Sequence, residues 1–304
     1  MAAFGFTTEL EAKVGMGTIY VLGAGFSKTC GIATDIEMLD SLNRLLKRTV
    51  EKDGGAPRTT IEHLREQNFL NQREVSFELF MSTLSSLKFS AEYMGPGRNV
   101  FREEEKEIRS ALRTYLKTCV SDINWNIEGK TILDFMRRVD WKHDFILTFN
   151  YDLLLEAAAE RLDLVVGERV VHLHGAIGER TLAWPTYTKF AYRTTKMPLA
   201  PRWKRAFGIL RNQAQIDRFV FIGYSMPPSD LEAKSLFNYV DWYNQDSLRM
   251  PAFYEGKRVP KEKCYSYEIV VVNPSKTIAS NYGFFRRTPL FLPLTLEKWV
   301  KQLY

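Results

Sequence analysis

Short, mainly apolar runs recur along this chain, and segments whose apolar positions have helical spacing lie between them. The runs cover residues 19–22, 145–149, 170–174, 219–222 and 269–272. Apolar runs of this length, of which residues 19–22 are an uninterrupted example, are typical of strands that are buried on both faces of a parallel sheet. Because strands and helices alternate, the pattern predicts an α/β fold with a doubly wound, Rossmann-like parallel sheet.

The region 49–139 differs from its surroundings because its apolar residues recur only at helical spacing. Turn-like sequences at residues 53–57 (DGGAP) and 95–97 (GPG) divide it. We interpret this region as a helical insertion after the first strand–helix unit, within a single domain of residues 1–304. Two apolar stripes mark its main helices: Phe77, Phe80, Met81, Leu84 and Leu87, then Ile108, Leu112, Tyr115, Leu116, Cys119 and Ile123.

Each predicted strand is followed by small or polar residues. In an open parallel sheet the carboxyl ends of the strands form the ligand crevice, so these residues are expected to converge. Simpler roles remain open for several of them. Asn150, Asp152 and Asp230 could cap or begin the helices that follow, and His172 could be a core histidine with its hydrogen bonds satisfied. Strand alternation sends His172 and His174 to opposite faces, which leaves His174, at a strand end, as the better catalytic candidate.

The first strand runs into a glycine turn, GAGFS at residues 23–27. Gly23 and Gly25 let the backbone turn sharply and approach a ligand, and Ser27 adds a hydroxyl, which favours a phosphate site. The alternative is packing alone, since any doubly wound fold needs a tight turn here. Lys28 stands where the dehydrogenase fingerprint has its third glycine, and no acid follows at the usual offset, which disfavours a standard dehydrogenase.

Composition narrows the class of protein. Of 304 residues, 45% are hydrophobic, enough for a substantial core. No apolar run reaches the roughly 18 residues of a membrane span, and the N-terminal residues are acidic where a signal peptide is basic, so we expect a cytoplasmic protein without a membrane segment. The three cysteines form no CxxC pair, so neither a disulfide framework nor a zinc site is expected.

The net charge of +6 is concentrated between residues 193 and 218. Such a segment could meet nucleic acid, a phosphate-rich ligand or an acidic partner. However, Trp203, Phe207 and Leu210 give it an apolar side at helical spacing, which favours an ordinary helix with a solvated basic face and makes direct nucleic-acid binding an unfavoured interpretation. The basic residues are Arg193, Lys196, Arg202, Lys204, Arg205, Arg211 and Arg218.

Five motifs in order, GAGFSKTCGI, TFNYD, HLHG, FIGYSMPPSD and VVVNPS, resemble the motif series of the sirtuin-like (Sir2) NAD-binding superfamily, most closely bacterial sirtuin-like effectors of anti-phage defence. The resemblance implies NAD as the substrate and no metal. It places Asn150 and Asp152 near the nicotinamide ribose and makes His174 the catalytic base, with Asn150 as its catalytic partner. The residues that it assigns to the rest of the nucleotide are Gly23, Ala24, Gly25, Ser27, Asp35, Gly223, Tyr224, Ser225, Asp230 and Asn273.

The chain also departs from the sirtuin pattern. The stretch from Ala33 to Ile36 replaces the proline, acid, aromatic and arginine of sirtuins, and the four zinc cysteines of the deacylases are absent. These departures disfavour a protein deacylase and favour an NAD+ glycohydrolase that depletes NAD in an infected cell. A non-catalytic NAD- or ADP-ribose-binding regulatory subunit, or an interaction subunit, remains the alternative. The resemblance further suggests a homo-oligomer and a partner such as a HerA-like ATPase or an Argonaute-like protein.

Overall fold

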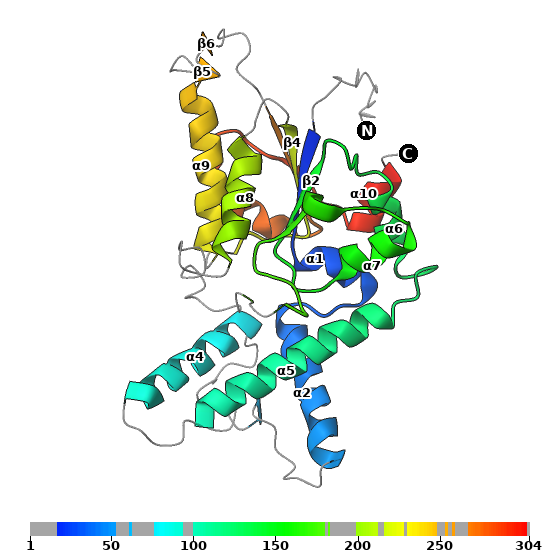
Figure 1. The fold of residues 1–304 in the computed structure, drawn as a ribbon, viewed down its shortest axis with the longest axis vertical. Coiled ribbons are helices and arrows are strands. Elements are labelled where there is room, and N and C mark those ends of the chain that lie inside the picture. The colour runs from blue at the N-terminus through cyan, green and yellow to red at the C-terminus, as the bar shows by residue number, and fades with distance from the viewer. Residues whose placement is uncertain are drawn as a thin grey trace.

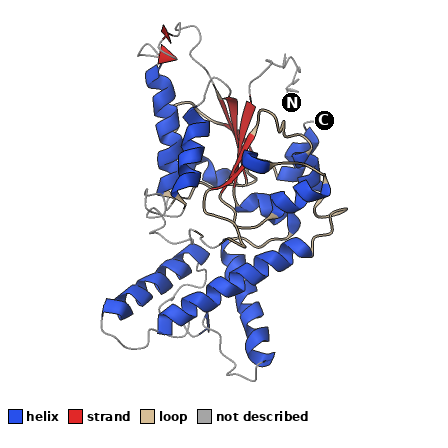
Figure 2. Ribbon diagram, viewed as in Figure 1, coloured by secondary structure: helices blue, strands red, loops and turns tan. Residues whose placement is uncertain are grey.

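The structure, a computed structural model, describes residues 17–52, 61–62, 76–93, 100–179, 182, 199–211, 216–227, 230–247, 253–254, 257–258 and 267–302. Within these residues, no helix is both long enough and apolar enough to cross a membrane. The predicted strands and helices are present, with shifted ends in places (Figure 2).

Six parallel strands form the central sheet, in the order β3-β2-β1-β4-β7-β8 (Figure 1). The sixth strand, β8, was not among the five predicted strands. β3 ends at His172, two residues before its predicted end, because the chain turns there and Gly175 has a positive φ. The strands are β1 (Gly17–Leu22), β2 (Phe145–Thr148), β3 (Val170–His172), β4 (Ile216–Ile222), β7 (Glu268–Val272) and β8 (Leu290–Leu292).

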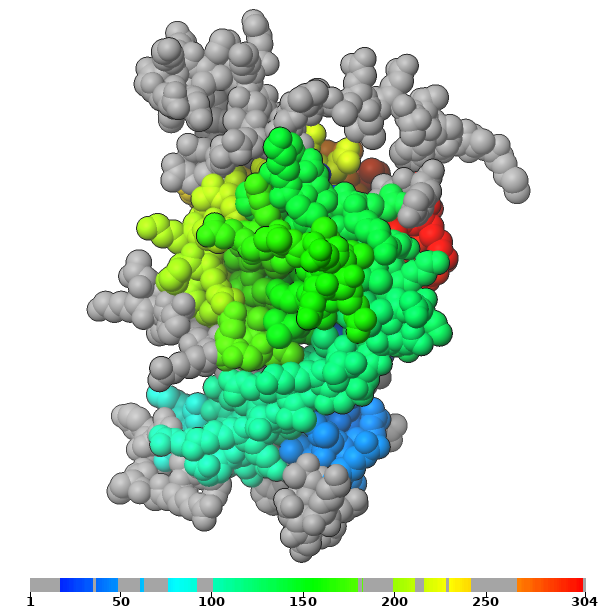
Figure 3. Space-filling view, turned by 45° about the vertical axis from the view of Figure 1, so that its right-hand side comes forward, coloured from blue at the N-terminus to red at the C-terminus, as the bar shows by residue number. Residues whose placement is uncertain are grey.

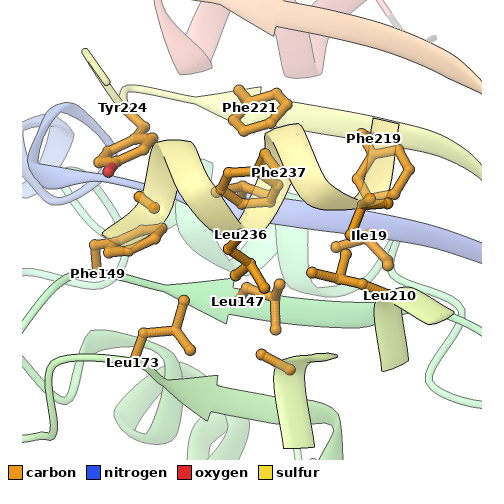
Figure 4. Close-up of a cluster of buried hydrophobic side chains, with 14 of the residues drawn as sticks. Ile19, Leu147, Phe149, Leu173, Leu210, Phe219, Phe221, Tyr224, Leu236 and Phe237 are labelled. Atoms are coloured by element: carbon orange, nitrogen blue, oxygen red, sulfur yellow. The ribbon is translucent and has the colours of Figure 1, made fainter. Parts of the chain in front are cut away.

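Helices cover both faces of the sheet, so the predicted doubly wound α/β fold is confirmed. α8 (Ala200–Arg211) and α9 (Leu231–Ser247) pack on one face, and α6 (Lys130–Met136), α7 (Leu154–Arg161) and α10 (Leu296–Gln302) pack on the other (Figure 1). Alternating side chains explain this: Ile19 and Val21 join the first cluster and Leu22 the second. Figure 4 shows the first cluster, where Phe221 and Phe237 meet edge to face at 5.0 Å.

A separate helical layer lies beyond the sheet. It consists of α2 (Asp35–Lys52), α4 (Phe77–Tyr93) and α5 (Val100–Ser121), which share their own apolar core (Figure 1). In the described residues between α2 and β2, every element is a helix. The predicted start of the insertion, residue 49, falls inside α2, and α6 packs on the sheet and not in this layer. Tyr151, Leu153 and Ile177 from the sheet domain pack against this core, and the space-filling view shows α5 directly beside that part of the chain (Figure 3). The helical layer is therefore joined to the end of the sheet.

The remaining elements are short. In the described residues they are α1 (Ala24–Ser27), three 3-10 turns (Lys28–Cys30, Gly167–Arg169 and Lys276–Tyr282), and an antiparallel pair formed by β5 (Phe253–Tyr254) and β6 (Lys257–Arg258).

The parallel strands end at the same level. Leu22 is paired with Thr148 on one side and Ile222 on the other, and the register continues to His172, Val272 and Leu292. The residues that follow these strands must therefore meet along one edge, as the sequence predicted. The strand order changes direction between β1 and β4, and in this strand arrangement that switch point is where dinucleotides bind.

Candidate functional site

Two glycine loops meet at the switch point. The amide of Gly25 donates to the carbonyl oxygen of Gly223 at 2.9 Å, so the loop after β1 rests on the loop after β4. A methyl group built on Gly23 would lie 2.5 Å from the Cα of Tyr224, and one on Gly25 would lie 2.9 Å from the Cα of Gly223. Backbone contact between the loops is therefore one reason for the glycines, in addition to any approach of a ligand.

Asn150 ties the loop after β2 to the first glycine loop. Its side-chain nitrogen donates to the carbonyl oxygen of Gly23 and to the hydroxyl of Ser27, both at 2.9 Å. A carbonyl oxygen only accepts, so the amide nitrogen must be the atom that faces Gly23. Both amide hydrogens are thus used within the protein, and the side-chain oxygen of Asn150 is the atom left to meet a ligand.

Ser27 extends this network to Asp152. Its hydroxyl donates to Asp152 Oδ2 at 2.7 Å, and the amide of Leu154 donates to Oδ1 at 3.2 Å. Burial raises the pKa of the Asp152 carboxyl, although the bonds from Ser27 and Leu154 oppose this. Asp152 therefore holds both Ser27 and the first residue of α7, and the network joins four of the predicted site residues, Gly23, Ser27, Asn150 and Asp152.

A cavity of about 540 Å³ opens over these loops, and it gathers most of the predicted site residues. Among the predicted residues whose side chains are described, only Asn273 does not line it. Asp35 is the first residue of α2, and its side chain lies outside the described part of the chain. Asn273 lines a neighbouring cavity of about 620 Å³, which shares Gly25 and Gly223 with the first. The predicted residues in the first cavity are Gly23, Ala24, Gly25, Ser27, Asn150, Asp152, His174, Gly223, Tyr224, Ser225 and Asp230.

The fold resembles those of solved Sir2 homologues. A crystal structure of a Sir2 homolog–NAD complex is 14% identical, with a TM-score of 0.45 and coverage of 95% of this chain and 88% of that chain. A mutant Sir2 homologue bound to ADP ribose is 13% identical, with a TM-score of 0.45 and coverage of 95% and 91%. No family model matches the sequence. A sequence search among curated proteins finds no match either.

His174 lies in an aromatic part of the cavity. Its ring meets Phe149 edge to face at 5.1 Å and stacks on Tyr151 at 5.9 Å, and its side chain is 6% exposed. His172 points to the other face of the sheet, where its ring nitrogens reach Glu156 and the backbone of Asn150. The two histidines thus lie on opposite faces, as strand alternation predicted, and only His174 reaches the cavity.

The helical layer supplies a wall of the cavity that the sequence interpretation missed. The apolar stripes of these helices predict helix packing, which is where most of their residues are used, and no local pattern distinguishes the few that reach the cavity. The missed residues from this layer are Met38, Ser76, Phe77, Glu78, Leu112 and Leu116.

Tyr224 forms the floor of the cavity between two partners. Its ring stacks on Phe149 at 4.5 Å, and its hydroxyl donates to Asp230 Oδ2 at 2.6 Å. Burial, followed by the charge of Asp230, raises the pKa of Tyr224 well above its ordinary value. The phenol is therefore a hydrogen-bond donor that is not poised to ionise near neutral pH.

Replacing Tyr224 with phenylalanine is expected to lower the free energy of unfolding by about 1–3 kcal/mol, because it removes a buried hydrogen bond to a carboxyl group. Urea denaturation measures this change. Tyr239→Phe is the matched control, since that side chain is 41% exposed. Equal stability of the two variants would contradict a structural role for the Tyr224 hydroxyl.

The basic segment is largely engaged in ion pairs where the structure describes it. Arg202 binds Glu179 at 2.5 Å and Arg205 binds Glu168 at 2.8 Å. Arg218 binds Glu268 at 2.8 Å. Arg193 and Lys196 lie outside the described residues. α8 also buries Trp203 and Leu210 against the sheet, as its apolar spacing predicted.

Proposed function

We propose that this protein is an NAD+ glycohydrolase of the sirtuin-like superfamily, which cleaves NAD+ to nicotinamide and ADP-ribose. The observation that carries the proposal is that one cavity at the switch point of the sheet brings Asn150 and His174 together with both glycine loops. These residues come from four strand ends that are far apart in the sequence. The ordered motifs lead to the same assignment independently of that geometry.

The two neighbouring cavities suit the two halves of a dinucleotide. Both are lined by Gly25 and Gly223, so a diphosphate could cross at this point, with Lys28 on one side as a positive charge. The second cavity offers Asn273 together with apolar residues such as Leu294, which fits an adenosine with its planar base and hydroxyl-bearing ribose. The nicotinamide half would then lie in the first cavity, beside Asn150 and His174.

The proposed reaction needs few groups. Nicotinamide leaves as a neutral pyridine when the bond between its nitrogen and C1′ of the ribose breaks, so that step requires no strong acid. The site must hold the ribose as positive charge develops on it. The side-chain oxygen of Asn150 would orient a ribose hydroxyl, and His174 would accept the proton of the attacking water, whose oxygen forms the new bond to C1′.

The wall from the helical layer supports water as the nucleophile. Phe77 from α4, Leu112 and Leu116 from α5, and Met38 from α2 line the cavity, together with the polar side chains of Ser76 and Glu78. A largely apolar wall close to the reacting ribose favours a small nucleophile over the side chain of a bulky protein acceptor. Hydrolysis is therefore preferred over transfer to a peptide.

A role as the NAD-depleting effector of a bacterial anti-phage defence system extends this proposal. It rests on the resemblance of the motifs, as do a homo-oligomer and a partner ATPase or Argonaute-like protein. One observation favours the alternative of a non-catalytic NAD- or ADP-ribose-binding subunit. Both side-chain amide hydrogens of Asn150 are used to hold the glycine loop, so this residue has a structural role whether or not catalysis takes place.

Replacement of Asn150 with alanine tests the proposal. The wild-type protein is expected to release nicotinamide from NAD+, and Asn150→Ala is expected to lower that rate at least about tenfold, since it removes the oxygen that orients the ribose and the two bonds to the glycine loop. Chromatography of nicotinamide and ADP-ribose measures both rates, and calorimetry measures NAD+ binding.

Asn126→Ala is the matched control, because Asn126 is exposed and lines neither of the two cavities. Binding of NAD+ by the wild type without any nicotinamide release would favour the regulatory alternative. Absence of both binding and release would reject an NAD+ site altogether.

A further inference from the structure

His172 lies between two hydrogen-bond acceptors. It is the last residue of β3, and its side chain is 7% exposed. Its Nε2 is 2.8 Å from Glu156 Oε1 on α7, and its Nδ1 is 3.1 Å from the backbone carbonyl oxygen of Asn150. A carboxylate and a carbonyl both accept, so each ring nitrogen must carry a hydrogen to satisfy both contacts. The arrangement is therefore that of a positively charged imidazolium.

The charged groups around His172 support this state. Glu156 faces it from α7, and Asp152 lies in the loop before that helix. Arg202 from α8 donates to the backbone oxygen of His172 at 3.0 Å. Burial acts to lower the pKa of His172, but the hydrogen bond and charge of Glu156, with the smaller effects of Asn150 and Asp152, outweigh it, so the pKa is raised.

Asn150 is held on both of its sides. Its backbone carbonyl accepts from His172, and its backbone amide donates to the hydroxyl of Thr148 at 3.1 Å. On the cavity side its side chain reaches Gly23 and Ser27. The hydrogen bond from His172 thus connects α7 and β3 to Asn150, the residue next to the proposed ribose.

We propose that His172, held by Glu156, is a positioning residue that fixes the backbone of Asn150 so that its side-chain oxygen is aimed at the reacting ribose. This inference rests on the proposed function. A neutral imidazole has one N–H and can donate to only one of the two acceptors. Loss of the proton therefore releases either Glu156 or Asn150.

The sign of the pH effect follows from the raised pKa. The unfolded chain loses the His172 proton near pH 6.5. The stabilising contribution of the imidazolium is fully present below that pH and is lost as pH rises through the higher pKa of the folded protein. Turnover is therefore expected to fall as pH rises and His172 loses its proton. At low pH, turnover is expected to fall because the base His174 becomes protonated.

The Glu156→Gln variant distinguishes the alkaline limb of the kcat–pH profile, which we assign to His172, from the acid limb, which we assign to His174. The amide still accepts a hydrogen bond but no longer holds the proton on His172 by its charge. We expect the alkaline limb of the kcat–pH profile to move to lower pH while the acid limb stays in place. At pH 7.5, kcat should fall about tenfold, because one hydrogen bond from a charged donor is lost, and KM should change less. Glu160→Gln, an exposed position on the same helix, is the control and should leave both limbs unchanged.

A second readout follows the His172 ring itself. The chain has four histidines, so the NMR signals of His172 are assignable by their loss in His172→Gln. The ring is expected to titrate at a higher pH in the wild type than in Glu156→Gln. If the wild type and Glu156→Gln are both active and the alkaline limbs of their kcat–pH profiles coincide, the positioning role is overturned. A His172 ring that is neutral at pH 7 would overturn it as well. Either result would leave the proposed function intact. A wild-type protein that releases no nicotinamide would instead reject the proposed function, and this inference with it.

Discussion

With alanine in place of His174, nicotinamide release is expected to fall by about 10² to 10⁴-fold, the usual contribution of a general base. Among the described residues that line the first cavity, His174 is the only histidine, and Asn150 lines the same cavity. Its ring is fixed by Phe149 and Tyr151, so its nitrogens have a defined direction before any ligand binds. Without it, no imidazole among the described lining residues remains to accept the proton of the attacking water.

NAD+ binding should change much less than turnover in the same variant, because the glycine loops and the second cavity would supply most contacts to the nucleotide. Calorimetry and single-turnover kinetics measure the two effects separately. His143→Ala is the control, since His143 is a partly exposed residue bound to Asp140. Wild-type turnover in His174→Ala would remove this histidine from the mechanism.

Gly223→Ala is expected to cost about 2–5 kcal/mol of unfolding free energy and to abolish NAD+ binding. The φ angle of Gly223 is +59°, a conformation that costs other residues about 1–2 kcal/mol. A methyl group there would also overlap the backbone nitrogen of Phe26 and lie 2.8 Å from the Cα of Gly25. These are backbone atoms of the opposite loop, so the added methyl can be accommodated only by separating the loops, which adds a cost of about 1–3 kcal/mol.

Urea denaturation and calorimetry with NAD+ measure the two effects. Gly208→Ala is the matched control, because Gly208 lies in α8 and a methyl built on it meets no other atom within 4 Å. This control is expected to gain up to about 1 kcal/mol from the better helix propensity of alanine. A Gly223→Ala protein with wild-type stability and affinity would mean that the loop contact is not required.

The sequence predicted the common edge of the sheet well because the relevant signal is local. Each run is mainly apolar, and these parallel strands end at the same level, so the positions of Asn150, His174 and Gly223 relative to one another followed from their own neighbours. β8 was missed since it has only three residues, none of them fully buried, between Pro289 and Pro293. A short strand at the edge of the sheet has no continuous apolar signal.

Other features depend on contacts between distant parts of the chain. The glycines were interpreted as leaving room for a phosphate. The structure shows in addition that a side chain on either Gly25 or Gly223 would collide with the backbone of the other. His172 was correctly interpreted as buried with its hydrogen bonds satisfied, but its partner Glu156 lies 16 residues earlier on a helix, and no pattern pairs them. The cavity wall contributed by Phe77 and Leu112 was not predicted either, because it also depends on contacts between distant parts of the chain.

The central place of β1 in the sheet also bears on how the chain is made. β1 is the first described strand to leave the ribosome, yet its neighbours are β2 and β4, and the latter ends at Ile222. Until that residue is synthesised, one side of β1 has no strand to pair with, and its unpaired backbone groups are open to other chains. We therefore expect the sheet to assemble slowly relative to the helices α4 and α5, whose contacts are local. Nascent chains of this protein are expected to depend on chaperones until the second half has emerged.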